Sequence, residues 1–274
     1  MKVAVCFRPN FTDAANAARE ATARMRRDGH EVVEITLDTV RPEQLTGVQV
    51  ACVFGGDGTM LHAARGLAAL GVPLLGVNLG HLGFLTMIQA EDFDAAFADV
   101  IAGRYTIEER AMLEARLTRG GTSVLTALAL NDVVVARGAL VRSIHVAISV
   151  DDEPLIVYWA DGVIAATATG STAYAFSVGG PLMPPTSPAI VLAPVAPHLS
   201  FANAFVLEQD PRIDLEVKDE PARLSIDGQV ERDLVSGDHV AVRRSPTAAR
   251  LVRTAHARPF LALLRQKILK EPPQ

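Results

Sequence analysis

The chain has 274 residues, of which 49% are hydrophobic and 21% charged, enough for one large or two ordinary globular domains with a real core. Its net charge of −5 argues against a general nucleic-acid-binding protein, which needs a basic face, but allows small anionic substrates where the site is locally positive. No apolar stretch approaches the length of a membrane span, and the N-terminal apolar run is too short for a signal peptide. Cys6 and Cys52 both lie in apolar strand-like runs. We therefore expect a soluble cytoplasmic protein with buried thiols and no disulfide or zinc site, which binds neither nucleic acid nor membranes.

The first hundred residues alternate between strand and helix patterns. Strands are expected at residues 2–7, 31–37, 48–54 and 71–77, and helices at 12–27, 61–68 and 91–101. This alternation predicts an α/β domain over residues 1–104, with a parallel sheet covered on both faces. Because such sheets bind ligands at the carboxyl ends of their strands, the turns that follow the strands are the first candidates for a site.

A glycine-rich turn, Gly-Gly-Asp-Gly-Thr at residues 55–59, joins an apolar run to a helical pattern. Its glycines permit unusual backbone angles, and the helix start offers unpaired N–H groups that suit a phosphate. A carboxylate beside phosphate is repelled unless it binds a metal ion or takes a proton from an attacking hydroxyl, and Asp57 is placed for either role. The alternative is a plain strand-to-helix turn in which Asp57 caps the helix.

After residue 103 the pattern changes to short strands separated by turns. Strand-like runs fall at residues 133–135, 144–150, 155–158, 163–167, 213–217, 224–226 and 240–242. Several alternate apolar and polar side chains, as a sheet with one buried face requires, so we expect an all-β, sandwich-like domain over residues 105–250. The last segment, 251–274, carries a helical stripe from Phe260 to Ile268 and is expected to return to the first domain.

Two stretches of this second half carry polar groups at strand ends. The first begins at Asp161 and runs into a turn rich in hydroxyl groups with Tyr174 beside them; hydroxyls can bind ribose or phosphate oxygens, or merely cap a helix. The second is Asn131-Asp132 before an apolar strand. An amide can read an adenine and a carboxylate can bind ribose hydroxyls, although the pattern alone favours a plain turn.

Two common nucleotide motifs, the P-loop and Gly-x-Gly-x-x-Gly, are missing, so positive charge for a phosphate must come from a metal, main-chain N–H groups and a few cations. Along nearly its whole length, the chain resembles the ATP-dependent NAD kinase family. The matching motifs are residues 55–59, Asn78-Leu-Gly-His-Leu-Gly-Phe84, Asn131-Asp132, Asp161-Gly162, Thr169-Gly-Ser-Thr-Ala-Tyr174 with Gly179-Gly180-Pro181, and Asp227-Gly-Gln229. The first is shared with lipid kinases and phosphofructokinases, whereas the 169–174 stretch together with residues 131–132 is highly specific.

The resemblance implies transfer of the γ-phosphoryl group of ATP, or of inorganic polyphosphate in some members, to the 2′-hydroxyl of the adenosine ribose of NAD, usually with Mg²⁺. It implies that Asp57 is the catalytic base and that Gly55, Gly56, Gly58 and Thr59 hold phosphates. The implied NAD-binding residues are Asp57, Gly58, His62, Phe84, Asn131, Asp132, Arg142, Asp161, Thr172, Ala173, Tyr174, Ser177 and Gln229. The resemblance also implies a homodimer or homotetramer with the NAD site shared between subunits.

Four positions depart from the family pattern. Asp132 stands where many members have Glu, Ala168 where proline is usual, and Trp159 where a small or basic residue is frequent. The Arg-Pro pair that commonly follows the Ser-Phe of residues 200–201 is missing. The change at Trp159 bears on how the nicotinamide end of NAD is held.

Two other functions compete with this one. A lipid or small-alcohol kinase of the same superfamily would keep residues 55–59, but it needs an apolar acceptor pocket and does not predict the 131–132 and 169–174 motifs. A non-catalytic dinucleotide sensor has no need of Asp57 between two glycines, which weighs against it.

Overall fold

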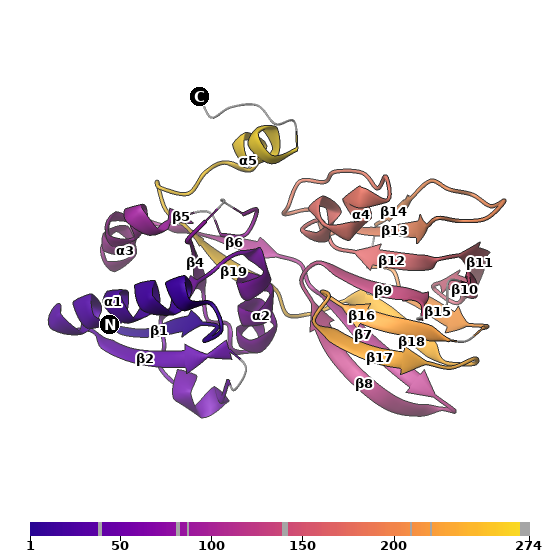
Figure 1. Ribbon diagram of the computed structural model, residues 1–274, viewed down its shortest axis with the longest axis horizontal. Helices are drawn as coiled ribbons and strands as arrows, with labels where there is room; N and C mark the ends of the chain where they lie inside the picture. Colours follow the sequence, from indigo (N-terminus) through magenta and orange to yellow (C-terminus); the bar gives the residue numbers. More distant parts are fainter. Residues whose placement is uncertain are drawn as a thin grey trace. The chain divides into compact units, whose positions relative to one another are not determined.

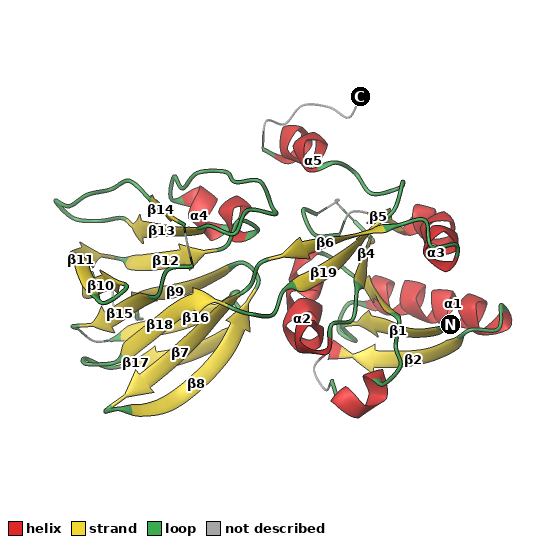
Figure 2. Ribbon diagram, turned by 180° about the vertical axis from the view of Figure 1, so that it is seen from behind, coloured by secondary structure: helices red, strands yellow, loops and turns green. Residues whose placement is uncertain are grey.

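The computed structural model describes residues 1–37, 40–80, 83–86, 88–138, 142–208, 210–219 and 221–268. Its contacts divide the chain into two compact units, unit 1 formed by Met1–Glu109 with Ala249–Gln274 and unit 2 formed by Arg110–Ala248 (Figure 1). Unit 1 is an α/β domain with a parallel sheet and unit 2 consists of antiparallel sheets, which confirms the predicted fold class (Figure 2). His81 and Leu82 of the 78–84 motif lie outside the described residues.

Unit 1 is built on one seven-stranded sheet, ordered β2-β1-β3-β4-β19-β6, with β5 beside β4. Its strands are β1 (Lys2–Phe7), β2 (Glu31–Thr36), β3 (Val50–Phe54), β4 (Leu74–Asn78), β5 (Ile88–Gln89), β6 (Thr106–Arg110) and β19 (Ala249–Arg253). β1 pairs in parallel with β2 and β3, and β4 pairs in parallel with β3, β5 and β19. The central strands are buried almost throughout, which explains their continuous apolar sequences. The sequence pattern does not predict β6 or β19.

Helices cover both faces of this sheet. The helices of unit 1 are α1 (Thr12–Arg27), α2 (Asp57–Leu67), α3 (Phe93–Ile101) and α5 (Phe260–Lys267), with short 3-10 turns η2 (Pro42–Leu45), η3 (Ala68–Leu70) and η4 (Ala90–Asp92). α1 and α3 share one core with Leu75 and Val77 of β4. A Cβ on the intervening Gly76 would meet Met60 Sδ of α2 at 3.0 Å, so α2 packs on the opposite face. Among the helices in the described ranges, none combines the length and the apolar character needed to cross a membrane.

The connections that leave β1 and β3 run in opposite directions across the sheet. From β1 the chain passes through α1 to β2 on one side, and from β3 it passes through α2 to β4 on the other. Such a reversal opens a crevice at the carboxyl ends of two neighbouring strands, which is where open α/β sheets bind ligands. The segments at this point are 8–14 after β1 and 55–59 after β3.

Unit 2 contains two six-stranded antiparallel sheets that share one hydrophobic core, in the manner of a sandwich. The first, ordered β11-β10-β15-β18-β7-β8, is made of β7 (Leu113–Arg119), β8 (Thr122–Ala129), β10 (Ile144–Val150), β11 (Glu153–Ala160), β15 (Ile213–Val217) and β18 (His239–Arg244). The second, ordered β14-β13-β12-β9-β16-β17, is made of β9 (Asp132–Arg137), β12 (Gly162–Ala166), β13 (Ile190–Val195), β14 (Phe205–Leu207), β16 (Ala222–Ile226) and β17 (Val230–Leu234).

The second sheet is buried on its other face as well. The segment that follows β12 contains η5 (Gly170–Thr172) and α4 (Tyr174–Ser177). Its Ala175 and Met183 pack against Ile164 and Val191 of the sheet. β12 is therefore buried along its whole length, and the segment with the predicted hydroxyl groups is fixed against the sheet.

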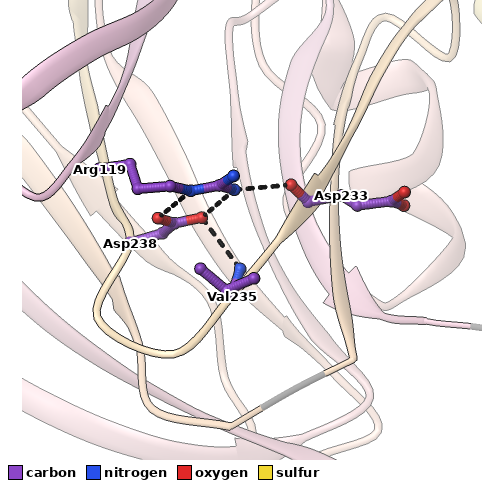
Figure 3. A network of polar contacts seen from close by, with 4 residues as sticks. All are labelled: Arg119, Asp233, Val235 and Asp238. Atoms are coloured by element: carbon purple, nitrogen blue, oxygen red, sulfur yellow. Dashed lines mark hydrogen bonds and ion pairs between the residues drawn. The ribbon is translucent and has the colours of Figure 1, made fainter.

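A buried carboxylate ties two turns of unit 2 together (Figure 3). Asp238 is fully buried and accepts hydrogen bonds from Arg119 Nε at 2.9 Å, Arg119 Nη2 at 2.7 Å and the Val235 N–H at 2.9 Å. Arg119 Nη2 also donates to the main-chain oxygen of Asp233 at 3.0 Å. The hydrogen bond from Arg119 lowers the pKa of Asp238 below its usual value, against the opposing effect of burial.

Candidate active site

The turn between β3 and α2 has the predicted strand-turn-helix geometry. α2 begins at Asp57, and its N-cap residue, Gly56, provides no side-chain cap. Gly55 has φ +150°, and a Cβ there would lie 2.4 Å from Thr59 Oγ1, so only glycine fits at this position. The main-chain N–H groups in the first turn of α2 therefore face the space in front of the helix N-terminus, an arrangement that suits an anion.

A cavity of about 670 Å³ opens in front of this turn. Its lining comes from the ends of three neighbouring strands. The residues after β1 are Arg8, Asn10, Phe11, Thr12, Asp13 and Ala14, and those after β3 are Gly55, Gly56, Gly58 and Thr59. The third group begins at the end of β4 and consists of Asn78, Leu79 and Gly80. The cavity lies at the reversal of strand order described above, and its volume suits a nucleotide-sized ligand. The sequence analysis assigned no role to residues 8–14, because that segment carries no glycine-rich signal.

Asp57 does not cap its own helix; its half-buried carboxylate points to the loop that precedes β5. Oδ1 accepts hydrogen bonds from Leu85 N–H at 3.0 Å, Thr86 N–H at 3.1 Å and Thr86 Oγ1 at 3.2 Å, and Oδ2 accepts one from Phe84 N–H at 2.8 Å. A Cβ on Gly83 would lie 1.8 Å from Oδ1, so only glycine allows this approach. Because a carboxylate oxygen has two lone pairs, Oδ2 can accept one further hydrogen bond while Oδ1 stays anchored.

Two buried polar residues support this carboxylate. Asn78 Nδ2 donates to Thr86 Oγ1 at 2.8 Å, and Thr86 Oγ1 donates in turn to Asp57. Asn78 is 3% exposed and Thr86 fully buried, so the chain of hydrogen bonds is shielded from water. The sequence analysis gave Thr86 no role, since a threonine after an apolar stretch is an ordinary strand residue.

The other two predicted NAD contacts of unit 1 lie on neighbouring elements. His62 is half-buried on α2, one turn after Asp57. The Phe84 ring lies 5.9 Å from the Phe260 ring of α5, and Lys267 Nζ lies 5.4 Å from the centre of the Phe84 ring. The C-terminal helix thus contacts the loop that holds Asp57.

In unit 2, most of the predicted NAD-binding residues gather at one end of the second sheet. Asp132 of β9 lies opposite Ala166, the last residue of β12, and the next β9 residue pairs with the end of β16. This register brings Asn131 and Asp132, the 172–177 segment and Gln229 to the same end. The Asp227 carboxylate binds this end together, since it accepts the N–H groups of Leu130, Asn131 and Asp132 at 2.9, 2.8 and 3.1 Å.

Asp132 is a buried carboxyl group, 6% exposed. Burial, and after it the negative charge of Asp227, raises the pKa of Asp132 to about 7. At neutral pH this group therefore exists in both its protonated and its ionised form. It can donate to, or accept from, a sugar hydroxyl according to pH.

Asp161 and Arg142 lie apart from that group. Asp161 precedes β12, so the five residues of the strand separate it from the Asp132 end by about 16 Å. Its carboxylate accepts a hydrogen bond from Ser143 Oγ at 3.1 Å and pairs with Arg137 Nε at 3.2 Å. Arg142 is exposed and lines a separate pocket of about 430 Å³ that also contains Trp159. One copy of unit 2 does not bring these two residues to Asn131.

Trp159, one of the departures from the family pattern, lies on the outer side of β11. Its indole is stacked with His145 at a centroid distance of 5.8 Å and lies 4.8 Å from His198. It remains 45% exposed, so a flat aromatic surface is available beside Arg142.

No group of three or more His, Cys, Asp or Glu side chains in the described part of the chain is arranged to hold a metal ion. An ion that arrives with substrate phosphates needs only one or two carboxylates, and Asp13 on the cavity wall is such a group.

Two family models match this chain, the ATP-NAD kinase N-terminal domain over residues 2–105 and the ATP-NAD kinase C-terminal domain over residues 130–254. The NAD kinases of Heliobacterium modesticaldum and Symbiobacterium thermophilum are both 44% identical to it, covering 82% and 81% of this chain and 80% and 78% of theirs. The NAD kinase of Chloroflexus aurantiacus is 36% identical over 96% of both chains.

Two solved structures share the fold over most of their length. Yeast NADH kinase complexed with NADH superposes with a TM-score of 0.85 at 25% identity, covering 100% of this chain and 89% of that one. An NAD kinase from Archaeoglobus fulgidus in complex with ATP superposes with a TM-score of 0.76 at 25% identity, covering 93% and 94%.

Proposed function

This chain belongs to the ATP-NAD kinase family, and from that premise we propose that it transfers the γ-phosphoryl group of ATP, or of inorganic polyphosphate, to the 2′-hydroxyl of the adenosine ribose of NAD. It is thus a phosphotransferase whose product is NADP. The observation that carries the proposal is the position of Asp57, which begins the helix whose turn lines the large cavity and keeps one oxygen able to take a proton. A lipid kinase gives no reason for a second half that matches the NAD kinase C-terminal model, and a non-catalytic dinucleotide sensor gives no reason for Asp57 between two glycines.

In this mechanism Asp57 Oδ2 is the base. The 2′-hydroxyl donates its proton to Oδ2 as its oxygen forms a bond to the γ-phosphorus, and the bond from that phosphorus to the leaving ADP oxygen breaks. The three hydrogen bonds to Oδ1 keep the carboxylate oriented throughout. Since phosphoryl transfer depends mainly on alignment and charge neutralisation, a fixed base of this kind is what the reaction needs from the protein.

The donor phosphates would lie in the cavity before α2. Gly55, Gly56, Gly58 and Thr59 form one wall of it and would bind phosphate oxygens through the main chain and the threonine hydroxyl. Mg²⁺ would enter as part of the MgATP substrate and would neutralise phosphate charge. Asp13 on the cavity wall is a carboxylate that would bind the ion.

Residues in each unit are proposed to contact the acceptor NAD. In unit 2 these are Asn131, Asp132, Thr172, Ala173, Tyr174, Ser177 and Gln229, which lie at one end of the second sheet. In unit 1 they are Asp57, Gly58, His62 and Phe84. The small side chains and hydroxyl groups of the 172–177 segment suit a flat ligand with ribose oxygens.

Asp161 and Arg142 would reach the same NAD from a partner copy. About 16 Å of strand separates Asp161 from the Asp132 end of its own chain, which favours a site completed by a second subunit. We therefore propose a homodimer or homotetramer as the active form. We also propose that it works in the cytoplasm, a reducing compartment that suits its two buried, free cysteines.

The direct test is to incubate the purified protein with NAD, ATP and Mg²⁺ and to measure NADP with an NADP-specific dehydrogenase. NADP should form in proportion to enzyme and time. A wild-type preparation that is folded and makes no NADP from either ATP or polyphosphate would reject the kinase function.

A further inference from the structure

Arg8 is an arginine with an unusual environment. It follows directly after β1, at the reversal of strand order, and lines the large cavity of unit 1. Its Nε is buried and makes no hydrogen bond, and within the described ranges its guanidinium has no carboxylate or carbonyl partner. Arginines elsewhere in unit 1 do have one: Arg24 pairs with Asp94 at 3.2 Å and Arg104 with Asp99 at 2.7 Å.

The guanidinium is held in place by an aromatic ring instead. Its central carbon lies 5.4 Å from the centre of the Phe11 ring. Phe11 is the N-cap residue of α1 and is 54% exposed at the same cavity. A large exposed aromatic side chain beside a positively charged wall is the pairing that proteins use for nucleotides, in which the ring stacks on the base.

The surroundings of Arg8 favour an anion with several charges. The first turns of α1 and α2 both line this cavity, and neither has a side-chain cap on its N-terminus. The partial positive charges of two helix starts thus converge on one space with a guanidinium that has no carboxylate partner among the described residues. Because the sequence has no P-loop lysine, these groups supply the positive charge that a triphosphate requires.

We propose that Arg8 binds the phosphates of the donor and that Phe11 stacks on its base, so that segment 8–14 selects the phosphoryl donor. The proposal rests on the kinase function given above and adds the residues that distinguish ATP from a donor without a base. Arg8 binds the phosphates of any polyphosphate donor, whereas Phe11 strengthens the binding of a nucleoside triphosphate alone, because only that donor has a base.

The test measures donor kinetics in three variants, with tripolyphosphate as a competitor that has phosphates and no base. Arg8→Met should raise the KM for ATP and the Ki of tripolyphosphate by about 10- to 100-fold, the loss expected for a hydrogen bond to a charged group. Arg8→Lys, which keeps the charge but loses the planar fork, should raise both by less. Phe11→Leu should raise the KM for ATP by at least about 5-fold and leave the Ki of tripolyphosphate unchanged.

A matched control is available on α1, the helix that begins in segment 8–14. Arg19 also lies over a ring, 6.0 Å from the centre of Phe7, but it does not line the cavity. Arg19→Met should therefore change neither donor constant, and the KM for NAD should stay the same in all of these variants. Thermal unfolding identifies any variant that has lost its fold; should Arg8→Met do so, Arg8→Lys decides the question.

Two results would overturn the proposal: Arg8 variants with wild-type constants for ATP and tripolyphosphate, or a wild type that tripolyphosphate does not inhibit. An equal effect of Phe11→Leu on both ligands would remove the stacking role. If the wild type formed no NADP, the kinase function would fail separately, and the ATP affinity of wild type and Arg8→Met, measured by calorimetry, would still test Arg8.

Discussion

The Asp57 carboxylate is oriented by hydrogen bonds that leave one oxygen able to accept a proton. Three of its four hydrogen bonds converge on Oδ1, and Oδ2 keeps one lone pair. The sequence allowed the residue to be predicted, because a lone carboxylate among glycines at a strand end has few purposes. The donors could not be predicted, since three of the four are main-chain N–H groups, which every residue but proline carries. Arg8 was missed because its distinction, a buried Nε that makes no hydrogen bond within the described ranges, appears only in the folded chain.

Among the described residues, Thr86 is the one whose side chain donates to Asp57 Oδ1. We predict that Thr86→Val lowers kcat by about 5-fold, the effect of one lost hydrogen bond, and leaves the KM for NAD unchanged. Thr86→Ser keeps the hydroxyl and should restore kcat. Steady-state kinetics of both variants checks this, and equal kcat values for the valine and serine variants would argue against a positioning role.

Asp132 makes stability depend on pH. Its pKa in the folded chain, about 7, lies above the unfolded value of 3.8, so the folded chain binds the proton more tightly. The free energy of unfolding that comes from this group is therefore greatest at low pH and falls as pH rises from about 4 through 7. Asp132→Asn, which cannot ionise, should lose less stability than the wild type between pH 5 and pH 8. Denaturant unfolding at the two pH values measures this; parallel losses would contradict the assignment.

At the scale of elements, the strands predicted from the sequence are of two kinds: runs buried on both faces, and runs such as β10 and β15 in which buried and more exposed side chains alternate. β1, β3 and β12 are continuous apolar runs because helices or a second layer cover each side. β8 and β17 were missed because most of their side chains are exposed or half-exposed and polar or small, so no alternation appears. β19 was missed because its parallel partner, β4, is far away in the sequence.

The turn before β18 depends on the Asp238 network. We predict that Asp238→Asn lowers the free energy of unfolding at pH 7 by about 2 kcal/mol, since the buried side chain loses the charge-assisted hydrogen bonds that its carboxylate accepts from Arg119 and the Val235 N–H. Because the pKa of Asp238 is lowered in the folded chain, the stabilisation is present above pH 4 and is lost as pH falls below it, where the two proteins should converge.

The matched control is an ion pair with an exposed arginine on β18, the strand that follows this turn. Arg243 pairs with Glu114 at 2.8 Å and is more than half exposed. Arg243→Met should cost less than about 1 kcal/mol. Urea unfolding of both variants makes the comparison, and equal costs would show that burial of Asp238 contributes nothing.

At the scale of the whole molecule, the predicted NAD contacts of unit 2 divide between two ends of one sheet. A site shared between copies of the chain accounts for this division. Complementation between two impaired variants tests whether the site is shared. Asp57→Asn and Asp161→Ala chains, each impaired alone, should regain activity when unfolded together and refolded as a mixture, because a mixed oligomer holds one site with both native residues. A mixture no more active than the sum of its parts would contradict a site shared between copies.

The most direct measurement of the central claim compares NADP formation by the wild type and by Asp57→Asn, with NAD binding measured in parallel. Asn keeps the size of the side chain and an acceptor for the loop donors, but it cannot take a proton. We predict that turnover falls by about 10²- to 10⁴-fold, the range for a positioned base, while the affinity for NAD changes little. Full turnover in Asp57→Asn would contradict the account.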